Sequence, residues 1–555
     1  MALMYALDRN SDSHDGVADT HRPFAQTQDN APLAKTSDDR RALLLFVAAT
    51  VLTAPMVVPL LRFPFGTPLH LNPWIELVLA TPVQFVIGAG IYRRGWRALT
   101  ALSCSVDLLV ALGTTAAYVA SVCLLLRYGL EASGIVYFEV STTIVTLAML
   151  GRWLDERTFA PEPGLRLADR LADIAVPAAF AIAFATLLGW FGAGRGFEYA
   201  AFVAMSVFII ACPGALAIAT AAALFAGVRA AARHDIAFKD VAAIDRVARL
   251  DTVAFDKTGT LTEGRAAVVG VELAPGVDAP RLLRLAAALQ VASDHPFAAA
   301  FRAAAPANVR LPSVERFRVE PGRGVVGVVE GREVAVGGRN LAGPAGVELG
   351  RLDAALIRFE REGKAAFIVA LSGRALGVIA VADPARPHAA EAVRALAALG
   401  VRAELLSSDN AVVGNKIAAE LGIGGCIPVR GQDEKVAAIR GLEGKGRRVG
   451  VVGTALPSEA SVSIVLGGNP HRVGAADLVL GRLEPRLVPA AVDVARRTVG
   501  TLRRNLFFAL AFNVMGVPVA VMGHAGPELA AAALGASVAT IAAGSFWLLA
   551  WRRHT

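Results

Sequence analysis

The stretch VAFDKTGTLTEG, Val253 to Gly264, places an aspartate, a lysine and two threonines directly after a short apolar run. A carboxylate such as that of Asp256 can accept a phosphoryl group and form an acyl phosphate, if Mg²⁺ and a lysine such as Lys257 neutralise the transferring oxygens. Phosphatases built on such a loop carry a second aspartate two positions later, as general acid and base. Thr258 stands there, so an acyl phosphate on this loop is expected to be long-lived.

The region 229–504 alternates short apolar runs with alanine-rich, helix-forming stretches. Five of the apolar runs end where polar or glycine residues begin: DTVAFDKTG, ALGVIAVAD, VRAELLSSD, RRVGVVGT and AADLVLG. This alternation predicts a parallel, doubly wound sheet with ligands at the carboxyl ends of its strands, where Asp256 lies. An insert from Arg265 to about Leu371 has a strand pattern of its own, GVVGVVEGREVAVGG, and is expected to form a second small domain.

The composition is that of a membrane protein, since 55% of the 555 residues are hydrophobic and the mean hydropathy is +0.52. Eight apolar segments are long enough, or nearly so, to cross a bilayer: 41–61, 73–92, 104–126, 134–153, 174–194, 199–228, 505–523 and 529–550. The net charge of +8 comes from arginines beside these segments, so it indicates membrane orientation and lipid contact rather than a nucleic-acid partner. Both termini and the region 229–504 are then expected in the cytoplasm, with the protein in a cell membrane, the inner one in a bacterium.

Residues 1–40 are polar and mixed in charge, and we expect a disordered tail rather than a signal peptide. Four cysteines in so long a chain form no disulfide framework, and reduced thiols are expected.

The loop DKTGTLT resembles the phosphorylation loop of P-type ATPases. The eight expected spans and the divided cytoplasmic region resemble the heavy-metal, copper-type branch of that family. The resemblance covers nearly all of residues 41–550. It implies an α-helical bundle of eight spans with a cytoplasmic α/β haloacid dehalogenase-like phosphorylation domain and an inserted α+β nucleotide-binding domain. The implied divisions are membrane helices 1–6 at 41–232, phosphorylation domain at 233–264 and 372–500, nucleotide-binding domain at 265–371, and membrane helices 7–8 at 501–555.

Further motifs follow in the order of that family, and they imply ATP and Mg²⁺ as cofactors. SDHPFA resembles the His-Pro nucleotide motif with His295 and Pro296, and PGRGVV resembles its glycine pair, Gly322 and Gly324. ADPARP resembles the hinge, with Asp383, Arg386 and Pro387. LLSSDN keeps the aspartate of a Thr-Gly-Asp-Asn motif as Asp409, and DEKVAAIR keeps the family's lysine as Lys435.

The resemblance also implies a cation path through the membrane. Fewer of the family's cation ligands are present in this sequence. IIACPGALAIAT has the proline of the family's Cys-Pro-Cys motif, with Cys212 before it and Gly214 in place of the second cysteine. A thiolate suits soft cations such as cuprous copper, and a small apolar packing role for Cys212 is the alternative. Asn513 and Ser537 match polar positions of the last two spans, while Glu139 and Asp169 match carboxylates of the family's ion-uptake path or are interfacial carboxylates.

Two parts of the family pattern are missing. The actuator domain, which carries Thr-Gly-Glu, is deleted near 157–167, and VVGTALPSEA has Thr454 where a magnesium-binding aspartate is usual. Two hypotheses stay open: an ATP-driven heavy-metal exporter, and a catalytically impaired pseudo-ATPase with a binding or regulatory role or the product of a decaying gene. The losses favour the second. An intact paralogue that supplies the actuator is a further possible partner.

Overall fold

The protein is described from a computed structural model. The described residues are 37–58, 71–101, 105–158, 166–211, 215–293, 297–306, 310–342, 347–409, 411–429, 431–453, 461–468, 476–524 and 527–552. The expected tail, 1–40, lies almost wholly outside them.

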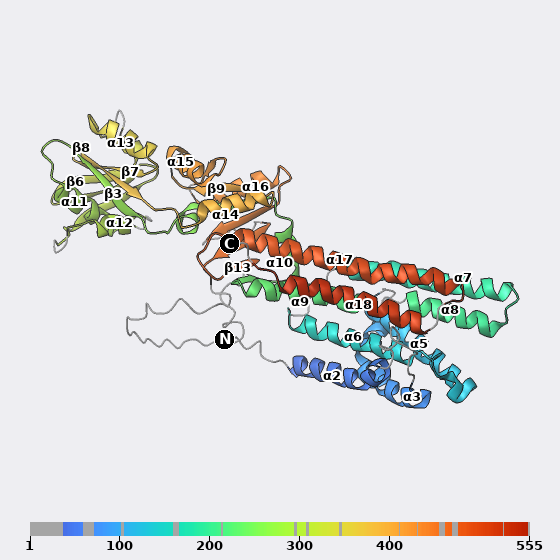
Figure 1. The fold of residues 1–555 in the computed structure, drawn as a ribbon. Helices are drawn as coiled ribbons and strands as arrows, with labels where there is room; N and C mark the ends of the chain where they lie inside the picture. The colour runs from blue at the N-terminus through green and yellow to red at the C-terminus, as the bar shows by residue number, and fades with distance from the viewer. Residues whose placement is uncertain are drawn as a thin grey trace, which may run out of the picture.

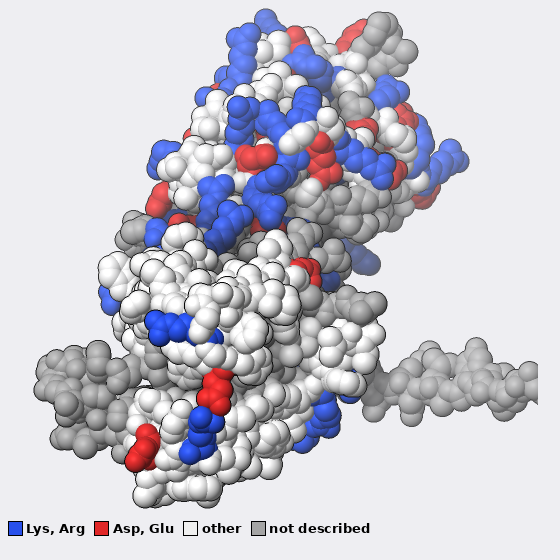
Figure 2. Space-filling model, turned by 90° about the vertical axis from the view of Figure 1, so that its right-hand side faces the viewer, with Lys and Arg blue, Asp and Glu red and all other residues white. Residues whose placement is uncertain are grey.

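Long apolar helices lie side by side in one half of the molecule, and a globular part lies at one end of them (Figure 1). The helices of this bundle are α2 (Ser37–Val57), α3 (Pro73–Pro82), α4 (Ala89–Thr100), α5 (Val106–Tyr128), α6 (Phe138–Glu156), α7 (Arg166–Gly192), α8 (Phe197–Ala211), α9 (Leu216–Ala232), α17 (Leu487–Val521) and α18 (Pro527–Leu549). Lys and Arg gather on the globular part, whereas the bundle presents a mostly uncharged surface (Figure 2). The protein is therefore a multi-pass membrane protein.

By length and composition alone, the described helices give five or six of the expected eight spans. Five of them, α2, α5, α7, α17 and α18, are long and apolar enough to cross a membrane, and a sixth span results if α3 to α4, bent by 56°, is counted as one. The segment 199–228 is divided into α8 and α9, each too short alone. Helix α6 falls short because charged residues occupy its last turns, from Arg152 to Glu156.

The first sheet of the globular part has seven strands in the order β1-β13-β12-β11-β2-β9-β10. Its strands are β1 (Ile236–Phe238), β2 (Thr252–Asp256), β9 (Arg402–Ser407), β10 (Cys426–Pro428), β11 (Val449–Gly453), β12 (Val462–Leu466) and β13 (Leu478–Leu480). All neighbours are parallel except β1 and β13. The main helices that accompany it are α10 (Val241–Ala248), α14 (Ala389–Ala398), α15 (Ala411–Leu421) and α16 (Gln432–Glu443). The predicted parallel sheet is confirmed, with β2 between β11 and β9.

The second sheet is antiparallel and has the order β3-β8-β7-β6-β5-β4. Its strands are β3 (Ala267–Leu273), β4 (Val314–Glu320), β5 (Gly324–Val329), β6 (Arg332–Gly337), β7 (Ala365–Leu371) and β8 (Arg374–Ala382), and it packs with α11 (Ala279–Val291), α12 (Ala298–Ala303) and α13 (Leu352–Arg361). One expectation is wrong here. The run ALGVIAVAD forms β8 of this sheet, because a tight turn at Ser372 and Gly373 folds it back onto β7 as a hairpin and its other edge pairs with β3.

Candidate functional site

Asp256 is the last residue of β2, at the carboxyl edge of the parallel sheet. Its backbone pairs with Leu406 of β9, and the preceding residue pairs with Val452 of β11. The buried run Thr252–Phe255 fixes the strand in the core. The chain then turns sharply, with Gly259 at a φ of 77°, which favours glycine. The Asp256 carboxylate therefore lies where neighbouring strand ends can bring partners to it.

Two lysines supply these partners. Lys435, in the first turn of α16, donates from Nζ to Oδ2 of Asp256 at 2.8 Å. Lys257 donates from its Nζ to Oδ2 of Asp409, which follows β9, and both side chains are at least 90% buried. Charge-assisted hydrogen bonds in such a setting are the stronger class. Four of the five expected catalytic residues thus lie together, and the fifth, Thr258, is exposed beside them.

The hinge motif holds this loop in place. Asp383 accepts a hydrogen bond from Thr262 Oγ1 at 2.6 Å and another from the backbone N–H of Arg265 at 3.1 Å. Arg386 donates from Nη2 to the carbonyl of Gly259 at 3.1 Å. Two of the three hinge residues named by the sequence therefore hold the turn that follows Asp256 and the residues directly after it.

Carboxylates are the groups near Asp256 that could hold Mg²⁺, since this ion favours carboxylate ligands. In the described residues, Asp256 pairs with Lys435 and Asp409 pairs with Lys257. An ideal Cβ on Gly453 would lie 3.3 Å from Oδ2 of Asp256, so the end of β11 approaches this carboxylate closely. The next residue, Thr454, lies outside the described residues.

One described residue of the nucleotide motif lies beside the phosphorylation loop. His295 and Pro296 lie outside the described residues, but the next residue, Phe297, has its ring centroid 6.0 Å from Nζ of Lys257. Gln290, at the end of α11, is buried, and its Oε1 has no hydrogen-bond partner among the described residues. This oxygen can accept a hydrogen bond from a ligand.

Gly322 and Gly324 form the turn between β4 and β5. Gly324 has a φ of 144°, and a Cβ there would lie 2.3 Å from the carbonyl oxygen of Val336. Only glycine fits this close approach of two strands. The glycine pair therefore has a clear structural role, which is compatible with backbone contact to a nucleotide.

Cys426 is a residue near the site that the sequence did not indicate. It is a free, half-buried thiol on β10. Burial raises the pKa of its thiol, the charge of Asp409 raises the pKa further, and Lys257 lowers it. The thiol is therefore a reporter of the charges around the phosphorylation loop.

In the bundle, the break between α8 and α9 contains Cys212 and Gly214, which lie outside the described residues. An ideal Cβ on Gly516 of α17 would lie 2.8 Å from Ile210 Cγ2, so α17 passes close to the end of α8. Asn513 lies one turn earlier on α17. Its Nδ2 and the Oγ of Ser537 on α18 are buried and have no hydrogen-bond partner among the described residues. Unpartnered buried polar atoms are costly, so both are available to a ligand near the break.

Glu139 lies in the first turn of α6 and is buried. Near the other end of this helix, Trp153 stacks on Phe46 of α2. Glu76 of α3, which the sequence did not indicate, is buried as well, and it interacts electrostatically with Glu139.

Asp169 falls on α7, and its side chain lies outside the description. The described residues contain no cluster of three or more His, Cys, Asp or Glu side chains that could hold a metal ion.

Comparison with known proteins shows the same architecture. The profile of the haloacid dehalogenase-like hydrolases matches residues 250–455. A copper-exporting P-type ATPase of Staphylococcus saprophyticus is 27% identical over 90% of this chain and 79% of its own length, and one of Mycobacterium tuberculosis is 37% identical over 70% of this chain and 51% of its own length. The chain belongs to the heavy-metal P-type ATPases.

A solved zinc-transporting ATPase of this type, in the E2.Pi state, has the same fold as this heavy-metal P-type ATPase. The two structures align with a TM-score of 0.69 and 21% sequence identity. The alignment covers 92% of this chain and 100% of the zinc-transporting ATPase chain. The alignment with the Staphylococcus relative has 633 positions but uses 90% of 555 residues, so more than 100 of its positions have no residue of this chain. The segment 157–165, which joins α6 to α7, is too short for a folded domain.

Proposed function

We propose that this heavy-metal P-type ATPase transfers the γ-phosphoryl group of ATP to Asp256 in the service of metal-cation transport. The observation that supports this most is the ion pair between Lys435 and Asp256, set beside the pair of Lys257 and Asp409. In this proposal Asp256 is the nucleophile, and the lysines offset the charge that develops on the transferring oxygens. Asp256 would hold Mg²⁺, which would supply further charge neutralisation there.

The nucleotide-binding role is assigned to the antiparallel sheet and its helices. His295 and Pro296 lie in the segment that precedes Phe297, and Phe297 is close to Lys257. A nucleotide held by this segment, by Gln290 Oε1 and by the turn at Gly322 and Gly324 can direct its phosphates toward Asp256.

The cation is proposed to pass through the break between α8 and α9. Cys212 provides the soft ligand, Asn513 and Ser537 provide polar atoms beside the break, and Asp169 remains a candidate on the uptake side. Glu139 remains a candidate carboxylate of the cation path, and the buried Glu76 is a further one. Copper is the first cation to test because the relatives are named as copper exporters, and zinc is the second because of the structural neighbour.

A second candidate is a pseudo-ATPase that binds nucleotide and metal without completing transport. The short connection between α6 and α7 favours it, because no chain is left there for the domain that positions water for hydrolysis in the family. Thr454 favours it as well, since it removes a magnesium ligand. An intact paralogue that supplies an actuator would reconcile the two candidates.

One experiment separates the two candidates. Metal-stimulated ATP hydrolysis is measured on the purified full-length protein and on Asp256→Ala, with metal content determined in parallel. Transport function predicts hydrolysis that rises with copper or zinc and is lost in the variant. Equal rates in the two proteins rule out transport and leave the pseudo-ATPase.

A further inference from the structure

Arg496, on α17, binds three backbone carbonyls of the globular part. Its Nε donates to Ala248 at 3.1 Å, its Nη2 donates to Leu250 at 2.9 Å, and its Nη1 donates to Leu399. The side chain is partly buried. A guanidinium presents five donors in a rigid fork, so three carbonyls from separate segments can define its position.

Two of the three carbonyls lie at helix ends, and the third lies just before a strand. Ala248 is the last residue of α10, and Leu399 caps the end of α14. The carbonyls at helix ends carry partial negative charge, which favours a cation there. Leu250 lies two residues before β2, the strand that ends at Asp256. Arg496 therefore joins a bundle helix to the start of the strand that carries the phosphorylation site.

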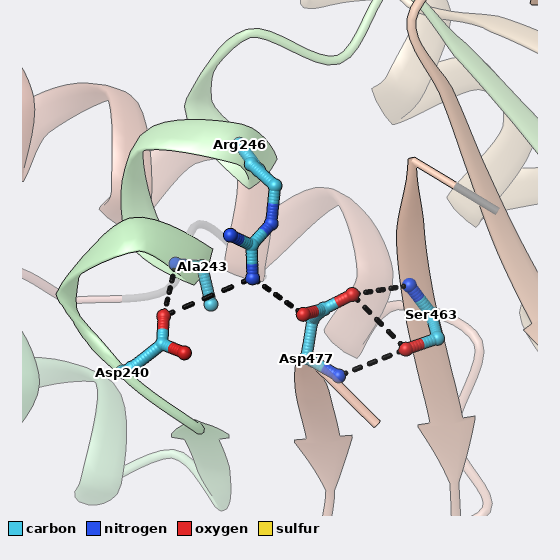
Figure 3. A network of polar contacts seen from close by, with 5 residues as sticks. All are labelled: Asp240, Ala243, Arg246, Ser463 and Asp477. Atoms are coloured by element: carbon cyan, nitrogen blue, oxygen red, sulfur yellow. Dashed lines mark hydrogen bonds and ion pairs between the residues drawn. The ribbon is translucent and has the colours of Figure 1, made fainter. Parts of the chain in front are cut away.

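Helix α10 is also fixed at its other end (Figure 3). Asp240 caps the helix by accepting from the backbone of Ala243 at 2.6 Å. Arg246 donates from Nη2 to Asp477 at 2.5 Å, and Asp477 accepts from the N–H and the hydroxyl of Ser463 at 2.9 and 3.0 Å. The helix is thus bonded to Asp477, the residue before β13, and through it to β12, so α10 and this part of the sheet are linked.

Helix α17 is suited to carry a displacement of the sheet into the bundle. It is continuous from Leu487 to Val521. Thr498, two residues after Arg496, packs so closely on α9 that a Cβ on Gly227 would lie 2.1 Å from its Oγ1. Helix α17 also passes close to the break that contains Cys212, because a Cβ on its Gly516 would lie 2.8 Å from Ile210 Cγ2 at the end of α8.

We infer that Arg496 is a positioning residue that transmits displacement between the Asp256 strand and the α9–α17 helix pair. The inference rests on the proposed function in one respect: phosphorylation of Asp256 is the event that displaces the strand. Arg497, the next residue, is the matched control, because it is exposed and pairs with Asp493 one turn earlier on the same helix, without contacting β2.

The test is amide hydrogen exchange on the full-length protein, with and without Mg²⁺ and beryllium fluoride, which mimics an acyl phosphate on Asp256. In the wild type we expect altered exchange both at 252–261 and at 505–521. In Arg496→Ala the change at 252–261 should persist, and the change at 505–521 should shrink by about tenfold. Arg496→Lys, which keeps the charge without the fork, should transmit less than the wild type, and Arg497→Ala should match the wild type.

Full transmission to 505–521 in Arg496→Ala overturns the inference. If beryllium fluoride leaves amide exchange at 252–261 unchanged in the wild type, the proposed function fails instead. The role of Arg496 is then tested by amide exchange measured without ligand. In that case the backbone amides at 244–250 and 396–401 must exchange about tenfold faster in Arg496→Ala than in Arg497→Ala. The reason is that only the Arg496→Ala variant loses charge-assisted hydrogen bonds to these segments. Equal rates in the two variants overturn the inference.

Discussion

Lys435 Nζ lies 2.8 Å from Asp256 Oδ2, although 179 residues separate the two in the chain. The whole antiparallel domain is inserted between them. The contact forms because β2 ends at the carboxyl edge of the parallel sheet and α16 begins at the same edge. This pair sets the first prediction.

Replacing Lys435 with alanine should lower the rate of phosphorylation by ATP by about a hundredfold or more, because a preorganised positive charge is removed from the reacting carboxylate. Acid-quenched labelling with γ-labelled ATP measures the rate. Lys445→Ala, an exposed lysine just after the same helix, is the control. Equal labelling in the two variants would contradict the assigned role.

Nucleotide binding should be weak and should depend on the segment before Phe297. His295→Ala is expected to lower ATP affinity, and Gln290→Leu should lower it too, because the free Oε1 is lost. Calorimetry measures both, and His524→Ala, an exposed histidine beside the bundle, is the control. ATP affinity unchanged in His295→Ala would show that the nucleotide lies elsewhere.

Metal binding in the bundle should depend on Cys212 and be weak. Cys212→Ser should lose the metal, and Asn513→Leu should lower affinity because it replaces a buried polar atom that has no partner among the described residues. Metal content after gel filtration is the measurement. Cys123→Ser, an exposed thiol on α5, is the control. Stoichiometric copper retained by Cys212→Ser would place the site elsewhere.

The thiol of Cys426 should react slowly with an alkylating reagent at neutral pH. Its raised pKa leaves little thiolate, the reactive form. Asp409→Asn should speed the reaction, since the loss of a negative charge lowers the thiol pKa and frees the positive charge of Lys257 to lower it further. Mass spectrometry of the alkylated peptide measures the rate. A slower reaction in Asp409→Asn would contradict the placement of these charges.

The sequence predicted the parallel sheet and the place of Asp256 at its carboxyl edge, because both depend on local signals. Apolar runs ended by polar residues locate strand ends, and Asp256, Asp409 and Lys435 follow from motifs. The assignment of β8 failed because a buried strand of either sheet has the same apolar pattern, and only its hydrogen-bond partners distinguish them. The Gln290 oxygen, the position of Glu139 and the carbonyl contacts of Arg496 depend on tertiary packing, so no local pattern marks them.

The last prediction concerns the phosphoenzyme itself. Asp256 should be labelled by γ-labelled ATP slowly, because Thr454 leaves Mg²⁺ held by Asp256, the nucleotide and water, and one lost contact of this kind raises the barrier by about 3–4 kcal/mol. The label should also decay slowly, since Thr258 offers no general base and the α6–α7 connection carries no domain to position water. Asp256→Asn is the blank. Thr454→Asp should speed labelling, because the end of β11 lies beside the carboxylate, but it should leave the decay slow. Rapid, metal-dependent loss of label in the wild type would reject the pseudo-ATPase and establish a working cycle.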